Sequence, residues 1–329
     1  MKILFYSTKS YDKKYFSEQN THHILDFRPY GLDIQTTDFA RGYDAICIFV
    51  NDICDADVID KLYRLGVKAI LLRCAGFNNV DIEYARKLNI KVARVPAYSP
   101  FSVAEHTLAL LLCLNRKIHK AYNRVKENNF NIEGLVGFDI HKKTIGIIGF
   151  GHIGKAFAQI CSGFGGKILV YDPYADLTVA PNYVTFVNDK NKLFAESDII
   201  SLHCPLNNET KYIINEDALK IMKSSAFIIN TSRGALIDTK AIIKSLKSKS
   251  ISALAIDVYE YEKDLFFKDM SEEIVDDDVF EKLLTLPNVL ITAHQAFLTK
   301  EALDGIAKTT LDNASSIEQS QWNDNFLVI

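Results

Sequence analysis

The stretch that decides the fold is Thr144-Ile145-Gly146-Ile147-Ile148-Gly149-Phe150-Gly151-His152-Ile153-Gly154, where an apolar run meets a glycine-rich turn. The short β-branched run Thr144–Ile148 predicts a strand, and the helical periodicity of Ile153–Phe164 predicts a helix directly after it. Asp172 ends the next predicted strand, Lys167–Tyr171. A GxGxxG turn between a strand and a helix, with an acidic residue closing the second strand, predicts a dinucleotide site.

Each residue of this motif has a physical role in such a site. Gly149 permits the tight turn, Gly151 lets the backbone approach the pyrophosphate, and Gly154 lets the helix pack on its strand. The helix N-terminus offers unpaired N–H groups to the phosphates. Asp172 can accept hydrogen bonds from the adenosine ribose and would repel a 2′-phosphate, which favours NAD over NADP. The alternative is a glycine-rich turn without a ligand.

The chain from residue 144 onward alternates short apolar runs with helical patterns. Such alternation predicts a parallel, doubly wound sheet. A final helical pattern, Lys300–Glu318, can belong to this domain or return to the first. The long apolar-periodic stretch from Ser102 to about Glu127 suits a helical connector between domains. The six strand candidates are Thr144–Ile148, Lys167–Tyr171, Ile199–His203, Ala226–Asn230, Leu254–Val258 and Val289–Thr292.

The first hundred residues show the same alternation and predict a second parallel sheet. Ala56–Leu65 and Asp81–Leu88 between the strands are predicted helices, and Asp81 is placed to cap the second one. Pro96 and Pro100 then interrupt the chain, because the residue before a proline avoids the helical conformation. The strand candidates are Lys2–Ser7, Ala45–Val50, Val67–Leu72 and Ile90–Val95.

Composition limits the class of protein. A chain of 329 residues with 48% hydrophobic and 24% charged residues is typical of a globular protein of two domains. The net charge of −3 and the lack of a basic block give a nucleic acid no evident binding surface. The apolar run Leu108–Leu114 is too short to span a membrane. Six scattered cysteines and no signal-peptide core indicate reduced thiols and a cytoplasmic location.

Polar residues that directly follow predicted strands are the first candidates for chemistry, because doubly wound sheets bind ligands at the carboxyl ends of their strands. Three such segments, Asn230–Gly234, Asp257–Glu262 and Thr292–Gln295, supply a guanidinium, carboxylates and an imidazole. An imidazolium beside a carboxylate can give a proton to a developing alkoxide, and a guanidinium can hold a substrate carboxylate. This set suits carbonyl reduction with a bound dinucleotide. The patterning does not choose among the carboxylates of residues 257, 260 and 262.

The alternatives are structural. His294 can be a hydrogen-bonded histidine at a strand end, and Arg233 can be an ordinary surface residue. No His, Cys, Asp or Glu group has the spacing of metal ligands, and no nucleophile elbow is present, so neither a metal site nor a serine hydrolase is expected. Ala75 and Gly76, in the predicted strand-to-helix turn Leu72–Asp81, leave backbone N–H groups open to an anion. A tight structural turn explains them equally well.

Taken in combination, these segments resemble the D-isomer-specific 2-hydroxyacid dehydrogenase family, and within it the branch that reduces pyruvate to D-lactate in fermentation. The resemblance runs nearly end to end and is most specific at Asn230–Ala235 together with Glu262 and His294. The other matching segments are Arg73–Asp81, Val95–Tyr98, Gly149–Gly154, Ser201–Leu206, Ile229–Asp238, Asp257–Phe267 and Thr292–Thr299.

The resemblance implies an α/β protein with two Rossmann- or flavodoxin-like doubly wound domains and a cleft between them. Residues 1–99 with 299–329 would form a discontinuous substrate domain, and residues 100–298 would form the NAD domain. His294 would donate the proton in pyruvate reduction, Glu262 would pair with it, and Arg233 would hold the carboxylate and keto oxygen. No metal is implied.

The family also assigns binding residues. Tyr98 and the backbone at Ala75 and Gly76 would contact the substrate carboxylate, and Phe49 and Phe297 would line its methyl group. Some relatives have Tyr where this chain has Phe49, which leaves the fit of larger keto acids open. The residues that would line NAD, besides the glycines of the turn, are His152, Ile153, Asp172, Cys204, Pro205, Thr210, Thr231, Ser232 and Asp257.

Relatives commonly dimerise through the NAD domains, so a homodimer or larger homo-oligomer is expected. Two other functions remain open. One is reduction of bulkier 2-keto acids, and the other is NAD sensing without catalysis, since some relatives act as transcriptional corepressors.

Overall fold

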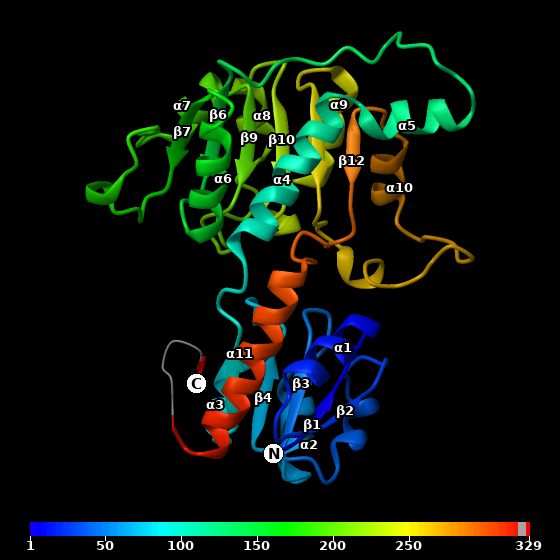
Figure 1. The fold of residues 1–329 in the computed structure, drawn as a ribbon, viewed down its shortest axis with the longest axis vertical. Coiled ribbons are helices and arrows are strands. Elements are labelled where there is room, and N and C mark those ends of the chain that lie inside the picture. The colour runs from blue at the N-terminus through cyan, green and yellow to red at the C-terminus, as the bar shows by residue number, and fades with distance from the viewer. Residues whose placement is uncertain (322–326) are drawn as a thin grey trace. The chain divides into compact units, whose positions relative to one another are not determined.

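The structure is a computed structural model that describes residues 1–321 and 327–329, and it divides into two units. Unit 1 consists of Met1–Ser99 and Leu298–Ile329, and unit 2 is Pro100–Phe297. Figure 1 shows both units as α/β structures built around a sheet. Within the described residues, no helix combines the length and the apolar composition needed to cross a bilayer.

Unit 1 contains a parallel sheet of five strands in the order β2-β1-β3-β4-β5. Four of them coincide with predicted strands, and β2 is an addition. Sequence patterning misses β2 because it is an edge strand with an exposed Ile24 and a polar Asp26, so its apolar signal is weak. The strands are β1 (Lys2–Phe5), β2 (Ile24–Phe27), β3 (Ala45–Ile48), β4 (Ala69–Leu72) and β5 (Lys91–Arg94).

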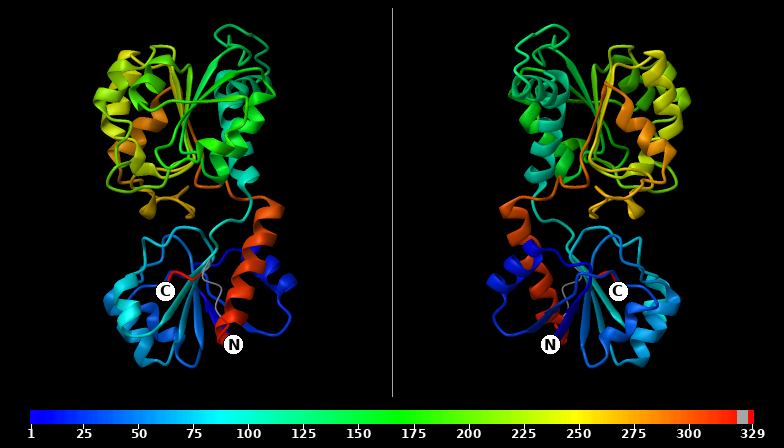
Figure 2. Two further views of the ribbon diagram at one scale, coloured as in Figure 1. Left: turned by 90° about the vertical axis from the view of Figure 1, so that its left-hand side faces the viewer. Right: turned by 90° about the vertical axis from the view of Figure 1, so that its right-hand side faces the viewer.

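The helices of unit 1 cover both faces of this sheet, as Figure 2 shows. Asp81 caps α3 by accepting a hydrogen bond from the Tyr84 N–H at 2.9 Å, which confirms the predicted cap. The predicted C-terminal helix is α11; it packs against α1 and joins unit 1, where the Asn313 side chain donates to the Arg94 carbonyl at 2.9 Å. The helices are α1 (Ser10–Gln19), η1 (Thr36–Ala40), α2 (Ala56–Arg64), α3 (Ile82–Lys87) and α11 (Lys300–Glu318).

Unit 2 contains a parallel sheet of seven strands in the order β12-β11-β10-β9-β6-β7-β8. The six predicted strands are present, and the three-residue edge strand β8 is an addition. The chain runs outward from β6 through β7 and β8 and then returns to β9 on the other side of β6, as in a doubly wound sheet. The strands are β6 (Thr144–Ile148), β7 (Lys167–Tyr171), β8 (Val184–Phe186), β9 (Ile199–Leu202), β10 (Phe227–Asn230), β11 (Ala253–Ile256) and β12 (Val289–Ile291).

The prediction of one helical stretch from Ser102 to Glu127 is wrong. The stretch contains two helices, α4 (Pro100–Asn115) and α5 (Ile118–Lys126), separated where Lys117 takes a left-handed φ of 52°. The Asn115 side chain pairs with the backbone of Phe138, through 2.7 Å and 2.9 Å hydrogen bonds. This tie holds the end of α4 against a later segment, and α5 then leaves in a new direction (Figure 1).

The remaining helices of unit 2 connect its strands and lie on both faces of the sheet (Figure 2). On one face, α4 packs closely against α6. The helices are α6 (His152–Ser162), η2 (Leu177–Val179), α7 (Lys190–Glu196), α8 (Glu216–Ile221), η3 (Gly234–Leu236), α9 (Thr239–Ser248), η4 (Glu262–Asp264) and α10 (Asp278–Thr285). The expected fold class, two doubly wound parallel α/β domains, is confirmed.

Candidate active site

The glycine-rich turn joins β6 to α6 at the point where the strand order in the sheet of unit 2 reverses. Gly149 has a φ of +93°, and a Cβ there would lie 2.6 Å from the backbone nitrogen of Cys204 at the end of β9. A Cβ on Gly154 would lie 2.1 Å from the Gly149 carbonyl oxygen. Both glycines are therefore required by close packing of the backbone.

Gly151 is different, because a Cβ there would meet no atom within 4 Å. It is exposed and forms the N-cap of α6 without a side chain to satisfy the first N–H groups of the helix. A side chain at this position would fill the space in front of the helix N-terminus. A pyrophosphate in that space can accept hydrogen bonds from the first N–H groups of the helix. The turn therefore fits a dinucleotide.

Asp172 lies at the end of β7 and is oriented toward the same turn. Its Oδ2 accepts from the Phe150 N–H at 2.7 Å, and its Oδ1 accepts from the Tyr174 N–H at 2.9 Å. The half-buried carboxylate is thus held in one position beside the glycines. This is the arrangement expected for a group that accepts hydrogen bonds from ribose hydroxyls.

The other residues expected to line the cofactor lie at the carboxyl ends of β9 and β10. Ser232 Oγ donates to the Cys204 carbonyl at 2.7 Å, and Thr210 Oγ1 donates to the Pro205 carbonyl at 2.6 Å, so these loops are tied into one edge. Burial raises the pKa of the Cys204 thiol to about 11, which leaves it neutral. Thr231 lies 2.8 Å from Thr107 of α4. In the first turn of α6, His152 is exposed and Ile153 half-buried.

His294 and Glu262 meet beyond the ends of β12 and β11. Nδ1 of His294 lies 2.7 Å from Oε1 of Glu262, and each side chain is 19% exposed. The other carboxylate oxygen of Glu262 accepts from the Tyr259 N–H at 2.9 Å. Among the side chains that the structure describes in unit 2, none makes a hydrogen bond with Nε2 of His294. The imidazole is therefore oriented through Nδ1 and has its second nitrogen available for a proton transfer.

Asp257 holds the loop that carries His294. Its carboxylate accepts from Thr292 Oγ1 at 2.5 Å and from the Gln295 and Ala296 N–H groups at 2.9 and 2.8 Å. Its carbonyl accepts from the His294 N–H at 2.7 Å. This grip accounts for the left-handed φ of 51° at His294, a conformation that costs a non-glycine residue about 1 kcal/mol or more.

The environment of Asp257 also fixes its charge. Burial works to raise the pKa of this fully buried carboxyl, but hydrogen bonds from His106, Thr292 and the loop N–H groups outweigh burial and lower the pKa. Nε2 of His106, on α4, lies 3.4 Å from Asp257 and 3.1 Å from Thr292. The sequence pattern does not single out His106, because it lies in an apolar-periodic helix, where a polar partner at a distant strand end leaves no local signal.

The three carboxylates that the sequence could not separate have different partners. The Asp257 carboxylate accepts hydrogen bonds from the loop of residues 292–296. Glu260 accepts from the Tyr212 hydroxyl and, at 2.9 Å, from Thr239 Oγ1. Glu262 alone of the three contacts the imidazole of His294.

Arg233 follows β10, which is adjacent to β11 in the sheet. The buried Asn230 shapes its loop by donating to the Arg233 carbonyl at 2.8 Å and accepting from the Ser232 N–H at 3.0 Å. Among the described residues of unit 2, the half-buried guanidinium makes a single hydrogen bond, from Nη1 to the Ser232 carbonyl at 2.7 Å. A guanidinium has five N–H donors, so most of them are available to a planar anion.

The candidate substrate contacts of unit 1 follow β3, β4 and β5. Asn79 fixes the Phe49 carbonyl through a 2.9 Å hydrogen bond, and the Arg73 guanidinium lies 5.0 Å from the centre of the Phe49 ring. Arg94 Nη1 donates to the Ala75 carbonyl at 2.9 Å, beside Gly76. Tyr98 lies beyond β5, its carbonyl 3.3 Å from where a Cβ on Gly305 of α11 would be. Phe297 is buried at the end of unit 2.

The chain is similar to a known protein family, to individual relatives and to solved structures. The family described as D-isomer specific 2-hydroxyacid dehydrogenase, NAD binding domain, matches residues 108–296. D-lactate dehydrogenase of Escherichia coli strain K12 is 49% identical over 330 residues, covering 100% of both chains.

Two solved structures are similar over nearly the whole chain. The pyruvate reductase of Chlamydomonas reinhardtii superposes with a TM-score of 0.93 at 40% identity and covers 99% of this chain and 98% of that one. D-lactate dehydrogenase with NAD⁺ from Lactobacillus jensenii superposes with a TM-score of 0.83 at 33% identity, covering 100% of both. The expected family and the expected cofactor are confirmed. This chain belongs to the D-isomer specific 2-hydroxyacid dehydrogenase family, and NAD is its cofactor.

Proposed function

We propose that this chain is an NAD-dependent D-lactate dehydrogenase that reduces pyruvate to D-lactate reversibly. The observation that carries the proposal is the 2.7 Å contact between His294 Nδ1 and Glu262 Oε1, which leaves Nε2 of His294 without a hydrogen-bond partner among the described side chains of unit 2. The similarity to a D-lactate dehydrogenase and to a pyruvate reductase supports the choice of substrate.

His294 is the proton donor in this proposal. Glu262 contacts Nδ1 and keeps it turned away from the substrate, so Nε2 presents the proton. NADH, when bound, supplies the hydride that reduces the C2 carbon of pyruvate. The keto oxygen then takes the proton from Nε2, which leaves lactate, NAD⁺ and a neutral imidazole.

Arg233 binds the substrate carboxylate and polarises the keto oxygen, since its free N–H donors match both. Ala75, Gly76 and Tyr98 contribute further carboxylate contacts, and Phe49 and Phe297 line the methyl group. Unit 1 is thus the substrate domain and unit 2 the NAD domain. Asp257 acts on the reaction by holding the loop that carries His294.

The cofactor is held by the glycine-rich turn and by the loops after β9 and β10. The N–H groups at the start of α6 bind the pyrophosphate, and Gly151 keeps the approach open. Asp172 accepts from the ribose hydroxyls and repels a 2′-phosphate, so NADH is preferred to NADPH. His152, Ile153, Cys204, Pro205, Thr210, Thr231 and Ser232 line the remaining surface.

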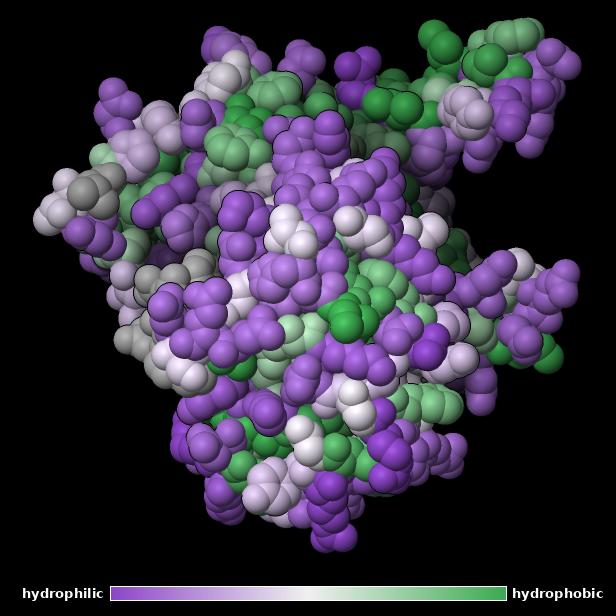
Figure 3. All heavy atoms as spheres, turned by 60° about the horizontal axis from the view of Figure 1, so that its bottom comes forward, coloured by the Kyte–Doolittle hydropathy of each residue, from purple (hydrophilic) through white to green (hydrophobic). Residues whose placement is uncertain are grey.

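The chain acts as a homodimer that associates through unit 2. Large apolar side chains on α5 and the segment that follows it are exposed, a feature typical of an interface. Figure 3 shows apolar side chains on the projection at the upper right, where Figure 1 places α5. The side chains are Ile118, Tyr122, Val125, Phe130, Ile132 and Val136, which are 53–84% exposed. All six cysteines are free thiols, which supports a reducing, cytoplasmic location.

The test is oxidation of NADH by a series of 2-keto acids of increasing side-chain size. Pyruvate should give the highest kcat/KM, and phenylpyruvate should be poor. His294→Asn should lose about 10²–10⁴-fold in rate while still binding NADH, and His141→Asn, an exposed histidine of the same unit, should be unaffected.

Each alternative gives a different result. Preference for the larger acids would make the chain a dehydrogenase for bulkier substrates. NADH binding without oxidation by any acid of the series would make it an NAD-sensing protein.

A further inference from the structure

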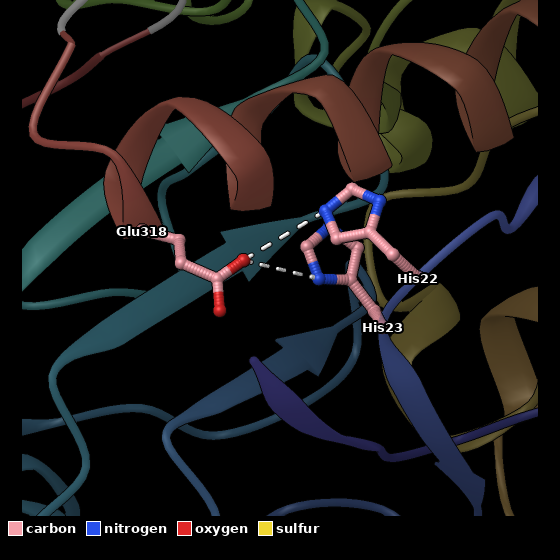
Figure 4. Close-up of side chains that lie close together, drawn as sticks. All are labelled: His22, His23 and Glu318. Atoms are coloured by element: carbon pink, nitrogen blue, oxygen red, sulfur yellow. Dashed lines mark ion pairs between the residues drawn. The ribbon is translucent and has the colours of Figure 1, made fainter.

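Two histidines and a glutamate from opposite ends of the chain meet in unit 1, outside the residues assigned to substrate and cofactor. His22 and His23 precede β2, and Glu318 is the last residue of α11. One potential ligand atom from each residue, a ring nitrogen or a carboxylate oxygen, lies within 4.8 Å of the other two. Figure 4 shows the Glu318 carboxylate directed at both imidazole rings. The sequence shows no metal-ligand spacing here, because the three residues come together only in the folded chain.

The distances fit a small divalent cation. Oε2 of Glu318 lies 3.7 Å from His22 Nε2 and 3.7 Å from His23 Nδ1. A tetrahedral Zn²⁺ with bonds of about 2.1 Å places its ligand atoms about 3.4 Å apart. A shift of a few tenths of an ångström would bring each of these two pairs to that separation, and the two ring nitrogens, which lie within 4.8 Å of each other, would also have to move closer.

The rings are held in place without the ion. His23 is buried, and its Nε2 lies 3.0 Å from Ser315 Oγ, which leaves Nδ1 facing Glu318. The exposed His22 ring lies 4.0 Å from the His23 ring, with Nδ1 3.0 Å from Thr21 Oγ1 and Nε2 directed at Glu318. Such partners orient ligating imidazoles in metal sites.

A positive group already lies against two of these ligands, and a bound metal ion would replace it there. The amino group of Met1 lies 2.5 Å from Glu318 Oε1 and 3.2 Å from His23 Nδ1.

We propose that His22, His23 and Glu318 form a binding site for Zn²⁺ or a similar divalent transition-metal ion. Two imidazoles and one carboxylate are ligands that such ions accept. The bound ion would join the start of β2 to the end of α11 and so fasten the C-terminal helix to the sheet edge of unit 1. The site is structural and takes no part in the proposed reduction.

The test is equilibrium dialysis of the full-length, chelator-treated protein against ZnCl₂ at neutral pH. The wild type should bind one Zn²⁺ more than His22→Ala or Glu318→Gln. Loss of either ligand should weaken this site by more than about 100-fold, since even second-sphere partners of a metal contribute 10–100-fold. His22 and Glu318 are both at least partly exposed, so these variants should fold.

Matched controls separate this site from background binding to other groups. His141→Ala replaces an exposed histidine of unit 2, and Glu301→Gln replaces an exposed glutamate of α11; both should bind as many Zn²⁺ ions as the wild type. ZnCl₂ should also raise the melting temperature of the wild type more than that of His22→Ala. Equal stoichiometry in the site variants and the wild type would overturn the proposal. Pyruvate reduction in metal-free buffer, which tests the proposed function separately, should be the same in His22→Ala and the wild type.

Discussion

Each sheet has a point where the order of successive strands reverses. In unit 2 this point lies beside β6, and in unit 1 it lies beside β1. At the first point the turn is made of glycines, and Gly151 leaves open space in front of a helix N-terminus. At the second point the space is filled by the Arg73 side chain, which is 2% exposed. The same arrangement of strands and helices therefore leaves room for a ligand in unit 2 and is filled by a buried side chain in unit 1.

The closed point of unit 1 is held by charge. Arg73 Nε donates to Asp12 Oδ1 at 3.2 Å, and Nη2 donates to the Tyr6 and Ser7 carbonyls at 2.9 Å each. Ser7 in turn donates to the buried Asp52 at 2.7 Å. These contacts occupy the carbonyl groups at the end of β1. The fold thus sets where a site can form, and the side chains decide whether it does.

The sharpest test of this comparison replaces one arginine in each unit. Arg73→Met should lower the free energy of unfolding by about 3–5 kcal/mol, because it leaves Asp12 buried without its partner. Arg233→Met should change that free energy by no more than about 0.5 kcal/mol and should abolish most pyruvate reduction. Urea unfolding and steady-state kinetics measure the two effects. The comparison fails if both variants lose stability equally.

A second test addresses the open turn. Gly151→Ala adds a methyl group to the space in front of α6 and should raise the Kd for NADH about tenfold or more, equivalent to about 1.4 kcal/mol of binding. Its effect on stability should not exceed about 1 kcal/mol, from weaker capping. Gly163→Ala, at the other end of α6 with a φ of −64°, is the control and should leave NADH binding unchanged. NADH fluorescence titration distinguishes them, and equal affinities would show that the space before α6 is not used.

The parts of the fold that the sequence predicts well are those with local signals. The strand Thr144–Ile148, the glycine-rich turn and the helix Lys300–Glu318 each have their own periodicity or motif, and the structure has the same bounds. The edge strands β2 and β8 lack such a signal because one side of each is not covered by another strand. The break between α4 and α5 depends on a contact from Asn115 to Phe138, which no window of sequence contains.

The candidate site shows the same limit. Placing polar residues at the carboxyl ends of predicted strands located Arg233, Glu262 and His294. It could not rank the three carboxylates, because their partners come from other elements: Tyr212 and Thr239 for Glu260, and the loop of residues 292–296 for Asp257. From the sequence, only the resemblance to the family selects Glu262.

The smallest expected effect compares two of the buried aspartates, Asp52 of unit 1 and Asp257 of unit 2. At Asp52, burial raises the pKa by more than the charge of Arg73 and the hydrogen bonds lower it. At Asp257, the hydrogen bonds lower the pKa by more than burial raises it. A raised pKa means that the folded chain binds the proton more tightly, so the contribution of Asp52 to stability grows as pH falls toward about 3.9, the unfolded value. A lowered pKa has the opposite sign, so the contribution of Asp257 is complete above about pH 3.9 and is lost below it.

Hydrogen exchange measured separately for the two units at a series of acid pH values should therefore show opposite slopes from these two groups. Asp257→Asn should be less stable than the wild type at neutral pH and should flatten the loss of protection in unit 2 below about pH 4, because the amide cannot titrate. Asp52→Asn should flatten the gain in unit 1 above about pH 4. If both substitutions changed the pH dependence in the same direction, the two carboxyls would have the same charge behaviour, and the contrast between a buried core and an organised loop would not hold for them.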